Sequence, residues 1–386
     1  MDKRVLFGAL FHWSSFLHIG SHQYAKQFAR HEYKVAYISK AISPFHFLFA
    51  KEKDVLKTKA SIWYKGGEWV ENGKIWTYVP LTLIPVHLKF LLTKSWFVRN
   101  NNKITIPNVK KILCKNHFEK VDILFLDEAE KYLLDLGVHK FSIYRIHDDI
   151  AHLRKYPALF EAHKEVIRNV DLIVSSSKKM ESFAKEVGAR RTLYLPNGVE
   201  FEYFYLSSDQ IPLEYQWISS PRAIYVGSIG DWFDVELIEY VAKKLKNFSF
   251  ILIGRPIISL SRLSNVQNIY LLGSRDYRLL PSYIKNADVG IIPWNSNKSW
   301  VKASHPNKLY MYMACGLPVV STKWEELENI NSPAYIASNK AEFLSYLEGA
   351  LNDKNKNRRK YIEFARKNSW ECRYKKLIKS VYSEGD

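Results

Sequence analysis

The feature that most constrains the fold is an alternation of short apolar runs with helical segments, which occurs twice along the 386 residues. Apolar strands separated by helices form βαβ units, in which the strands are parallel and helices cover both faces of the sheet. A chain of this length also exceeds what one hydrophobic core usually supports. The sequence therefore predicts an α/β protein with two Rossmann-like, doubly wound domains that face a cleft.

The two series of predicted elements are separated by a polar stretch without periodicity, "SSDQIPLEYQWISSPR", which we predict to be an interdomain linker. The predicted N-terminal domain covers 1–206, the linker 207–222, the C-terminal domain 223–368 and a terminal segment 369–386. In the first series, strands are predicted at 4–11, 34–39, 121–126, 141–146 and 170–177, with a helix at 20–31. In the second series, strands are predicted at 223–230, 248–254, 268–273, 287–294 and 318–322, with helices at 235–245 and 308–314.

The formal net charge of +18 is the largest signal in the composition. A field of that sign attracts phosphate-bearing partners, which are nucleic acids, anionic lipids or nucleotide-linked substrates. The sequence has no helix-turn-helix, zinc-finger or RNP signature to support nucleic-acid binding. The three cysteines form no CxxC pair, so neither a disulfide framework nor a cysteine metal site is expected, as in a cytoplasmic protein.

No segment contains 18 uninterrupted apolar residues, and the apolar run at the N-terminus is short, so we expect neither a membrane span nor a signal peptide. A basic and aromatic stretch at 80–111 suits a membrane interface instead. The alternative is a helix that lies partly on the core with a solvated basic side. The residues predicted to face a membrane are Lys89, Phe90, Lys94, Trp96, Phe97 and Arg99.

The segment "SHPNKLYMYMACG" predicts a short helix with an anion at its N-terminus. Pro306 suits the first helical turn, and Ser304 or Asn307 can cap it. Lys308 opposes the helix dipole unless a negative group lies there. Free N–H groups at a helix N-terminus bind anions, so the segment favours a phosphate site, with an ordinary capped helix as the alternative.

Two further turns follow predicted strands of the same sheet. "YVGSIGDW" leaves its strand through Gly227 and Ser228, where the backbone can approach a ligand closely. "LIGRP" ends its strand with Arg255, which suits a phosphate or a carboxylate. Because the carboxyl ends of parallel strands meet at one edge, the three turns together predict a nucleotide diphosphate site.

In the first series, "YRIHDDIAH" places Asp148 and Asp149 after a strand. Adjacent carboxylates repel each other, which can raise one pKa as a general base requires, whereas capping of the next helix is the alternative role for one of them. The loop after the first strand offers further polar groups, but their spacing is too loose to predict a zinc site. The residues predicted to face the acceptor from this loop are His18, Gly20, Ser21 and His22.

These segments resemble glycosyltransferases of the GT-B fold over nearly the whole chain, in particular "GSHQYAKQFARHEYKVAYIS" and "SHPNKLYMYMACGLPVVST". "YVGSIGDWFDVELI", "LPSYIKNADVGIIPW" and "NSWECRYKKLIKSVY" are similar to the branch with the xanthan-type glucuronosyltransferase and the teichuronic-acid glycosyltransferases. The last of these would be the terminal helix that crosses back onto the N-terminal domain in GT-B enzymes.

The resemblance implies transfer of a sugar, with glucuronate as one candidate, from a UDP-linked donor to a lipid-linked saccharide in the biosynthesis of capsule or exopolysaccharide. Such an enzyme would use no metal or other cofactor and would lie peripherally on the inner face of the cell membrane. Lys308 corresponds to the lysine that contacts the diphosphate, and Asp148 or Asp149 to the catalytic base. The resemblance further implies that the nucleotide is lined by Gly227, Ser228, Asn307 and Met311.

Retaining GT-B enzymes of this kind typically carry two glutamates eight positions apart, where this sequence has Ala303 and Met311. The departure favours direct displacement with inversion of the anomeric centre. A sugar-nucleotide epimerase of the same fold is the alternative enzyme, and a basic nucleic-acid-binding protein is the non-enzymatic alternative.

Overall fold

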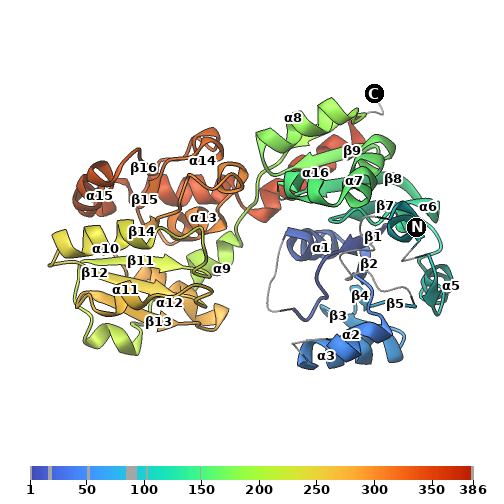
Figure 1. Cartoon of the computed structure of the whole chain (residues 1–386), viewed down its shortest axis with the longest axis horizontal. Helices are drawn as coiled ribbons and strands as arrows, with labels where there is room; N and C mark the ends of the chain where they lie inside the picture. Colours follow the sequence, from blue (N-terminus) through green and yellow to red (C-terminus); the bar gives the residue numbers. More distant parts are fainter. Residues whose placement is uncertain are drawn as a thin grey trace. The chain divides into compact units, whose positions relative to one another are not determined.

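The computed structural model describes residues 2–15, 20–49, 53–83, 94–100, 103–147 and 149–383. The chain forms two compact units, of which the first comprises Met1–Pro196 and Tyr374–Asp386 and the second Asn197–Arg373 (Figure 1). Each unit has a mainly parallel sheet with helices between its strands, so the predicted α/β class is confirmed.

The first unit is built around an eight-stranded sheet in the order β10-β9-β8-β7-β1-β2-β4-β3, in which only the β3–β4 pair is antiparallel. Strand β1 lies between β2 and β7, so the order of the strands reverses beside β1. Open α/β sheets bind ligands at such a point, beyond the carboxyl ends of the strands. The elements are β1 (Arg4–Ala9), α1 (Gly20–Arg30), β2 (Lys34–Ser39), α2 (Pro44–Phe49), α3 (Lys53–Tyr64), β3 (Glu68–Val70), β4 (Ile75–Tyr78), β5 (Leu81–Thr82), α4 (Ser95–Asn100), β6 (Thr105–Ile106), α5 (Val109–Lys115), β7 (Val121–Leu126), α6 (Lys131–Asp135), β8 (His139–Ile146), η2 (Ile150–Lys155), α7 (Pro157–Asn169), β9 (Leu172–Ser175), α8 (Lys178–Val187) and β10 (Thr192–Tyr194).

The second unit contains a six-stranded, fully parallel sheet in the order β13-β12-β11-β14-β15-β16. Strands β12 and β14 are buried along their whole length, as expected where helices cover both faces of a sheet. The order reverses between β11 and β14. The elements are α9 (Phe201–Leu206), η3 (Leu213–Gln216), β11 (Arg222–Val226), α10 (Val235–Lys244), β12 (Ser249–Ile253), α11 (Ser261–Ser264), β13 (Ile269–Gly273), η4 (Tyr277–Leu279), α12 (Leu280–Lys285), β14 (Val289–Ile292), η5 (Val301–Ala303), α13 (Asn307–Ala314), β15 (Val319–Thr322), α14 (Glu325–Asn329), β16 (Tyr335–Ala337) and α15 (Lys340–Lys367).

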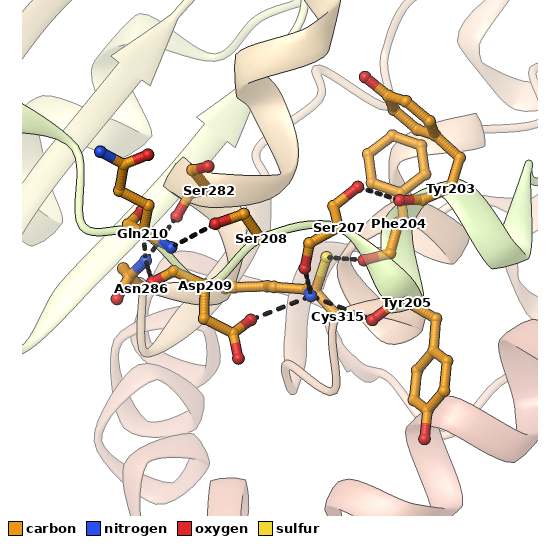
Figure 2. Close-up of polar contacts among 11 residues, drawn as sticks. Tyr203, Phe204, Tyr205, Ser207, Ser208, Asp209, Gln210, Ser282, Asn286 and Cys315 are labelled. Carbon is orange, nitrogen blue, oxygen red and sulfur yellow. Dashed lines mark hydrogen bonds and ion pairs between the residues drawn. The ribbon is translucent and has the colours of Figure 1, made fainter.

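Residues 207–222, which we predicted to be a linker, belong to the second unit instead. The ammonium of Lys285 in α12 donates to the carbonyl of Tyr205 at 3.0 Å and lies 3.0 Å from the carboxylate of Asp209. Asn286 donates to the backbone carbonyl of Asp209 at 3.2 Å, and Figure 2 shows how closely these polar contacts hold the segment. The polar segment is therefore held by hydrogen bonds and an ion pair from side chains at the end of α12. The boundary between the two units follows Pro196.

The C-terminal helix α16 (Trp370–Tyr382) joins the first unit from Tyr374 onward. The ring of Tyr374 packs edge-on against Phe28 of α1 at 5.1 Å, and the hydroxyl of Tyr382 lies 2.9 Å from that of Tyr33. In Figure 1 this red helix accordingly lies among green and blue elements of the first unit. The predicted return of the terminal helix to the N-terminal domain is confirmed.

None of the helices in the described ranges combines the length and the apolar character that crossing a membrane requires.

Candidate functional site

The second unit brings together the three turns that we predicted to hold a diphosphate. Gly227 follows β11 and adjoins the first turn of α13, since a Cβ at this position would lie 3.3 Å from Cε and 3.5 Å from Nζ of Lys308. The hydroxyl of Tyr312 in α13 accepts the N–H of Val226 at 2.8 Å, which fixes the helix to the end of β11. The N–H of Ile229 donates to the carbonyl of Arg255 at 3.0 Å. The turn after β12 is thereby joined to the loop after β11.

Glycine is required at two positions of this loop pair. Gly227 and Gly254 both have a φ in the left-handed region, at 135° and 156°. A Cβ at Gly254 would lie only 1.9 Å from the carbonyl oxygen of Gly227, so the two backbone segments touch directly.

The N-terminus of α13 differs from our expectation. The cap residue is Pro306, whose side chain accepts no hydrogen bond, and Asn307 is the first helical residue. The hydroxyl of Ser304 donates instead to the carbonyl of Trp300 at 2.9 Å. Neither Ser304 nor Asn307 therefore caps the helix, because the hydroxyl of Ser304 bonds to Trp300 and Asn307 already lies within the helix. The N–H of Leu309 donates to the carbonyl of Pro306 at 3.2 Å, whereas the described residues show no acceptor for the N–H groups of Asn307 and Lys308, which can serve an anion.

The ammonium of Lys308 lies over aromatic rings rather than beside a carboxylate. It is 4.4 Å from the ring centre of Trp294 and 5.0 Å from that of Tyr225. In the part of the chain that the structure describes, no hydrogen bond or ion pair holds this ammonium. Burial lowers the pKa of Lys308 to about 7. A half-buried cation without a counter-ion in the first turn of a helix is suited to an anionic ligand.

The other predicted nucleotide residues lie around this centre. Ser228 and Arg255 are exposed in the two loops, and Met311 is half-buried one turn after Lys308. The structure thus places Gly227, Lys308 and the loop of Arg255 together, with Asn307 as the first residue of α13 and Ser304 at the end of the preceding η5.

In the first unit, a buried charge cluster lies where β7 and β8 end. Asp127 follows β7 and its Oδ1 is 2.9 Å from Nη1 of Arg145 in β8, with both side chains almost fully buried. His147 follows β8, and its Nδ1 lies 3.6 Å from the same oxygen. Burial alone would raise the pKa of Asp127, but His147 and then Arg145 outweigh this effect and lower it. An ionised carboxylate beside a partly exposed imidazole can orient that ring as a general base.

Our sequence reasoning did not single out this cluster. The sequence feature that could have revealed the cluster is Arg145, a charged residue inside the apolar strand "FSIYRI", because a buried charge needs a partner. Asp127 stands directly after the apolar run "VDILFL", and β7 and β8 are parallel neighbours. That β7 and β8 are neighbours in the sheet follows from the tertiary structure and could not be predicted from the sequence alone.

Of the two carboxylates that we predicted as the catalytic base, the structure describes Asp149. Its Oδ2 lies 2.7 Å from the ammonium of Lys179, and its side chain is 8% exposed. This carboxylate is therefore held by a cation. Asp148 lies outside the described residues.

The loop residues that we expected to face an acceptor are buried instead. Ser21 and His22 are fully buried, and the hydroxyl of Tyr37 lies 3.2 Å from both Ser21 Oγ and His22 Nδ1. Gly20 begins α1 against the guanidinium of Arg145, where a Cβ would lie 2.6 Å from Cζ. These three residues pack beneath the edge of the sheet because helix α1 starts there, and His18 lies outside the described residues.

Two of the residues predicted to face a membrane are exposed. Lys94 is exposed directly before α4, and Trp96 in α4 is 60% exposed. Phe97 and Arg99 lie in the same helix, whereas Lys89 and Phe90 lie outside the described residues.

Within the described ranges, no three His, Cys, Asp or Glu side chains gather as they would around a metal ion. The metal-independent reaction that we expected stays a prediction.

Residues 220–353, which include Gly227, Arg255 and Lys308, match the family described as glycosyl transferases group 1. TuaH of Bacillus subtilis, which is named as a teichuronic acid biosynthesis glycosyltransferase, is 24% identical over 237 residues. The match covers 56% of this chain and 58% of TuaH, so it spans less than two thirds of that relative.

Solved structures resemble the chain along its whole length. The sucrose-phosphate synthase of Thermosynechococcus elongatus has a TM-score of 0.69 at 14% identity and covers 99% of both chains. HepE of Anabaena, solved in complex with UDP and glucose, has a TM-score of 0.67 at 14% identity and covers 99% of this chain and 100% of its own. These likenesses show the GT-B fold, and the sequence matches confirm the resemblance to GT-B glycosyltransferases and support the predicted transferase.

Proposed function

We propose that this chain is a glycosyltransferase of polysaccharide biosynthesis that moves a sugar from a UDP-linked donor, held by its second unit, to a saccharide acceptor. The observation that carries the proposal is the ammonium of Lys308, which lies beside Gly227 in the first turn of α13 without a counter-ion among the described residues. Support for the nucleotide comes from HepE, whose structure contains UDP, and support for the pathway comes from TuaH.

The diphosphate of the donor would be stabilised as a leaving group by positive charge from the protein. Lys308 supplies a full charge, and the first N–H groups of α13 supply the partial charge of the helix terminus. Arg255, whose side chain is exposed and has no ion-pair partner among the described residues, is suited either to the diphosphate or to the carboxylate of a glucuronate donor. With this charge in place the reaction needs no metal and no organic cofactor.

We propose that His147, oriented by Asp127, is the general base. Its Nε2 would take the proton of an acceptor hydroxyl as that oxygen bonds to the anomeric carbon and the bond to the diphosphate oxygen breaks. Direct displacement of this kind inverts the anomeric centre. Neither Ala303 nor Met311 can supply a carboxylate on the donor side, which favours the same outcome. Asp148 stays the second candidate for the base.

The experiment that tests this function is a thermal-shift screen against UDP-, GDP-, dTDP- and CMP-sugars, followed by a transfer assay with the sugar that stabilises the chain. A donor at 100 times its dissociation constant should add about 2.7 kcal/mol to the free energy of unfolding. Only UDP-linked donors should do so, and NMR of the product should show the inverted anomer. Lack of stabilisation by every donor would refute the function, and a retained anomer would refute the displacement.

We further propose that the acceptor is lipid-linked and that the chain lies on the inner face of the cell membrane. The exposed indole of Trp96, beside exposed Lys94, supports an interfacial anchor in a chain of net charge +18. Co-sedimentation with vesicles containing phosphatidylglycerol should therefore fall about fivefold in Trp96→Ala, since an interfacial tryptophan contributes roughly 1 kcal/mol. Trp217→Ala, which removes an indole of similar exposure from the second unit, should bind like the wild type; equal binding of all three proteins would contradict the assignment.

A further inference from the structure

Three basic side chains gather beyond the carboxyl ends of β1 and β2, and the reaction proposed above uses none of them. The two strands pair in parallel, and the N–H of Lys40, directly after β2, donates to the carbonyl of Ala9 at 2.9 Å. His12 follows β1 and is 5% exposed. Lys59 comes from α3, which packs its apolar side against Ile42, just beyond Lys40. The topology thus brings three bases from separate segments to one edge of the sheet.

In the described part of the chain, no carboxylate pairs with Lys40 or Lys59 and no group hydrogen-bonds to Nδ1 of His12. Lys40 and Lys59 are half-buried, and neither forms an ion pair with a carboxylate there. Nδ1 of His12 is buried and has no hydrogen-bond partner among the described residues. A buried polar atom without a partner and two cations without a counter-ion each cost free energy of folding.

Lys59 affects the pKa of His12, and Lys40 affects the pKa of Lys59. Burial, followed by the charge of Lys59, lowers the pKa of His12 to about 4. Burial, followed by the charge of Lys40, lowers the pKa of Lys59. Since burial and the charge of Lys40 both disfavour the ammonium form of Lys59, an anion bound beside these two lysines would favour that form.

We propose that His12, Lys40 and Lys59 form a binding site for an anionic group of the acceptor, either a phosphate or a carboxylate. The inference rests on the proposed function, because it takes the anion to be part of the sugar acceptor. Two ammonium groups with an imidazole nitrogen offer charge-assisted hydrogen bonds to several oxygens at once, as a phosphoryl group requires.

The place of the site in the fold favours the acceptor over the donor. The donor diphosphate has its own lysine, Lys308, in the second unit, whereas this site lies in the first unit with the proposed base. Strand β1 lies between β2 and β7, so His12 follows the strand next to the one that Asp127 follows, and Lys40 follows β2, on the other side of β1. The Nε2–H of His22 donates to the carbonyl of His12 at 3.1 Å, and its Nδ1 lies 3.2 Å from the hydroxyl of Tyr37. That hydroxyl lies 3.2 Å from Oγ of Ser21, which hydrogen-bonds to Asp127 and so links the two clusters. An anion bound here would orient the acceptor at the edge where His147 stands.

The test measures binding of two small probes to the full chain, with UDP present in excess to occupy the donor site. Inorganic pyrophosphate is titrated by ³¹P NMR, and free glucuronate is followed by saturation-transfer NMR. The variants are Lys40→Gln and the pair Lys40→Gln with Lys59→Met, which remove each charge with a side chain only slightly shorter than that of lysine. Lys57→Gln is the matched control, because it removes one charge from the same helix at a side chain that is 79% exposed.

We expect the wild type and Lys57→Gln to bind at least one probe with the same affinity. Removal of each lysine of the site should lower that affinity about tenfold, as loss of a charge-assisted hydrogen bond does. Binding of pyrophosphate would identify a phosphate of the acceptor, and binding of glucuronate a carboxylate. If neither probe binds, or if the double variant binds as tightly as the wild type, the site is refuted. A normal thermal shift with UDP in every variant shows intact folding and tests the donor site separately, so failure of this inference is distinguishable from failure of the proposed function.

Discussion

Replacing His147 by Gln is expected to lower kcat by about 10²–10⁴ while leaving the affinity for UDP within a factor of two. The amide keeps the size and polarity of the ring but cannot take a proton at neutral pH. Because His147 belongs to the first unit and Lys308 to the second, loss of the base should not alter the nucleotide site. Steady-state kinetics and calorimetric titration with UDP measure the two quantities separately.

Two neighbouring variants show whether the base has been identified correctly. Asp149→Asn should retain most activity, because the wild-type carboxylate is held 2.7 Å from Lys179 and does not need to accept a proton. Asp148→Asn is the decisive comparison. If kcat falls by about 10²–10⁴ in Asp148→Asn but is unchanged in His147→Gln, the base is Asp148 and the assignment to His147 is wrong.

Replacing Lys308 by Ala is expected to remove the thermal stabilisation by UDP, a loss of about 2.7 kcal/mol at 100 times the wild-type dissociation constant. A Cβ at Gly227 would lie 3.5 Å from Nζ of Lys308, so removal of the ammonium takes a full positive charge from the first turn of α13 beside Gly227. Lys308→Met is a second variant, because methionine removes the charge but still fills the space against Trp294 and so preserves the fold. Full stabilisation of either variant by UDP would show that the diphosphate binds elsewhere.

The lowered pKa of Lys308 also predicts how donor binding depends on pH. The pKa is about 7 in the free protein, and a bound diphosphate raises it because the anion favours the ammonium form. UDP affinity should therefore be greatest below pH 7 and should fall by up to tenfold per pH unit above it, until the pKa of the bound state is reached. Titrations in buffers with different ionisation enthalpies should show proton uptake on binding.

Lys308→Arg is the control for this effect. Arginine stays charged throughout the range, so its UDP affinity should be level between pH 7 and 9 and no proton should be taken up. A wild-type affinity that is level over the same range would contradict the assignment of the lowered pKa to donor binding.

Much of the second unit could be predicted from the sequence, because its signals are local. The strand "FSFILIG", the glycine at 227 and the lysine in the first turn of α13 all lie within a few residues of the features that make them recognisable. Apolar runs between helices predict parallel strands, and parallel strands bring their following loops to one edge. The placement of Lys308 beside Gly227 followed from these rules, and the structure agrees.

Where prediction failed, the cause was packing between segments far apart in the chain. The polar composition of 207–222 could not reveal that Lys285 of α12 binds the carbonyl of Ser207 and the carboxylate of Asp209. Ser21 and His22 were predicted to face an acceptor, but both lie in the first turn of α1 and are buried against Tyr37.

The amino-acid pattern by itself determined the doubly wound class, the position of most strands and the diphosphate candidate, because each depends on the period or chemistry of a short segment. Only the tertiary structure decided which charges meet. Asp127 with Arg145 and His147, and the group of His12, Lys40 and Lys59, come from strands and helices that adjoin through the order of the sheet. That order results from the burial of whole surfaces, to which every segment contributes and which no single segment encodes.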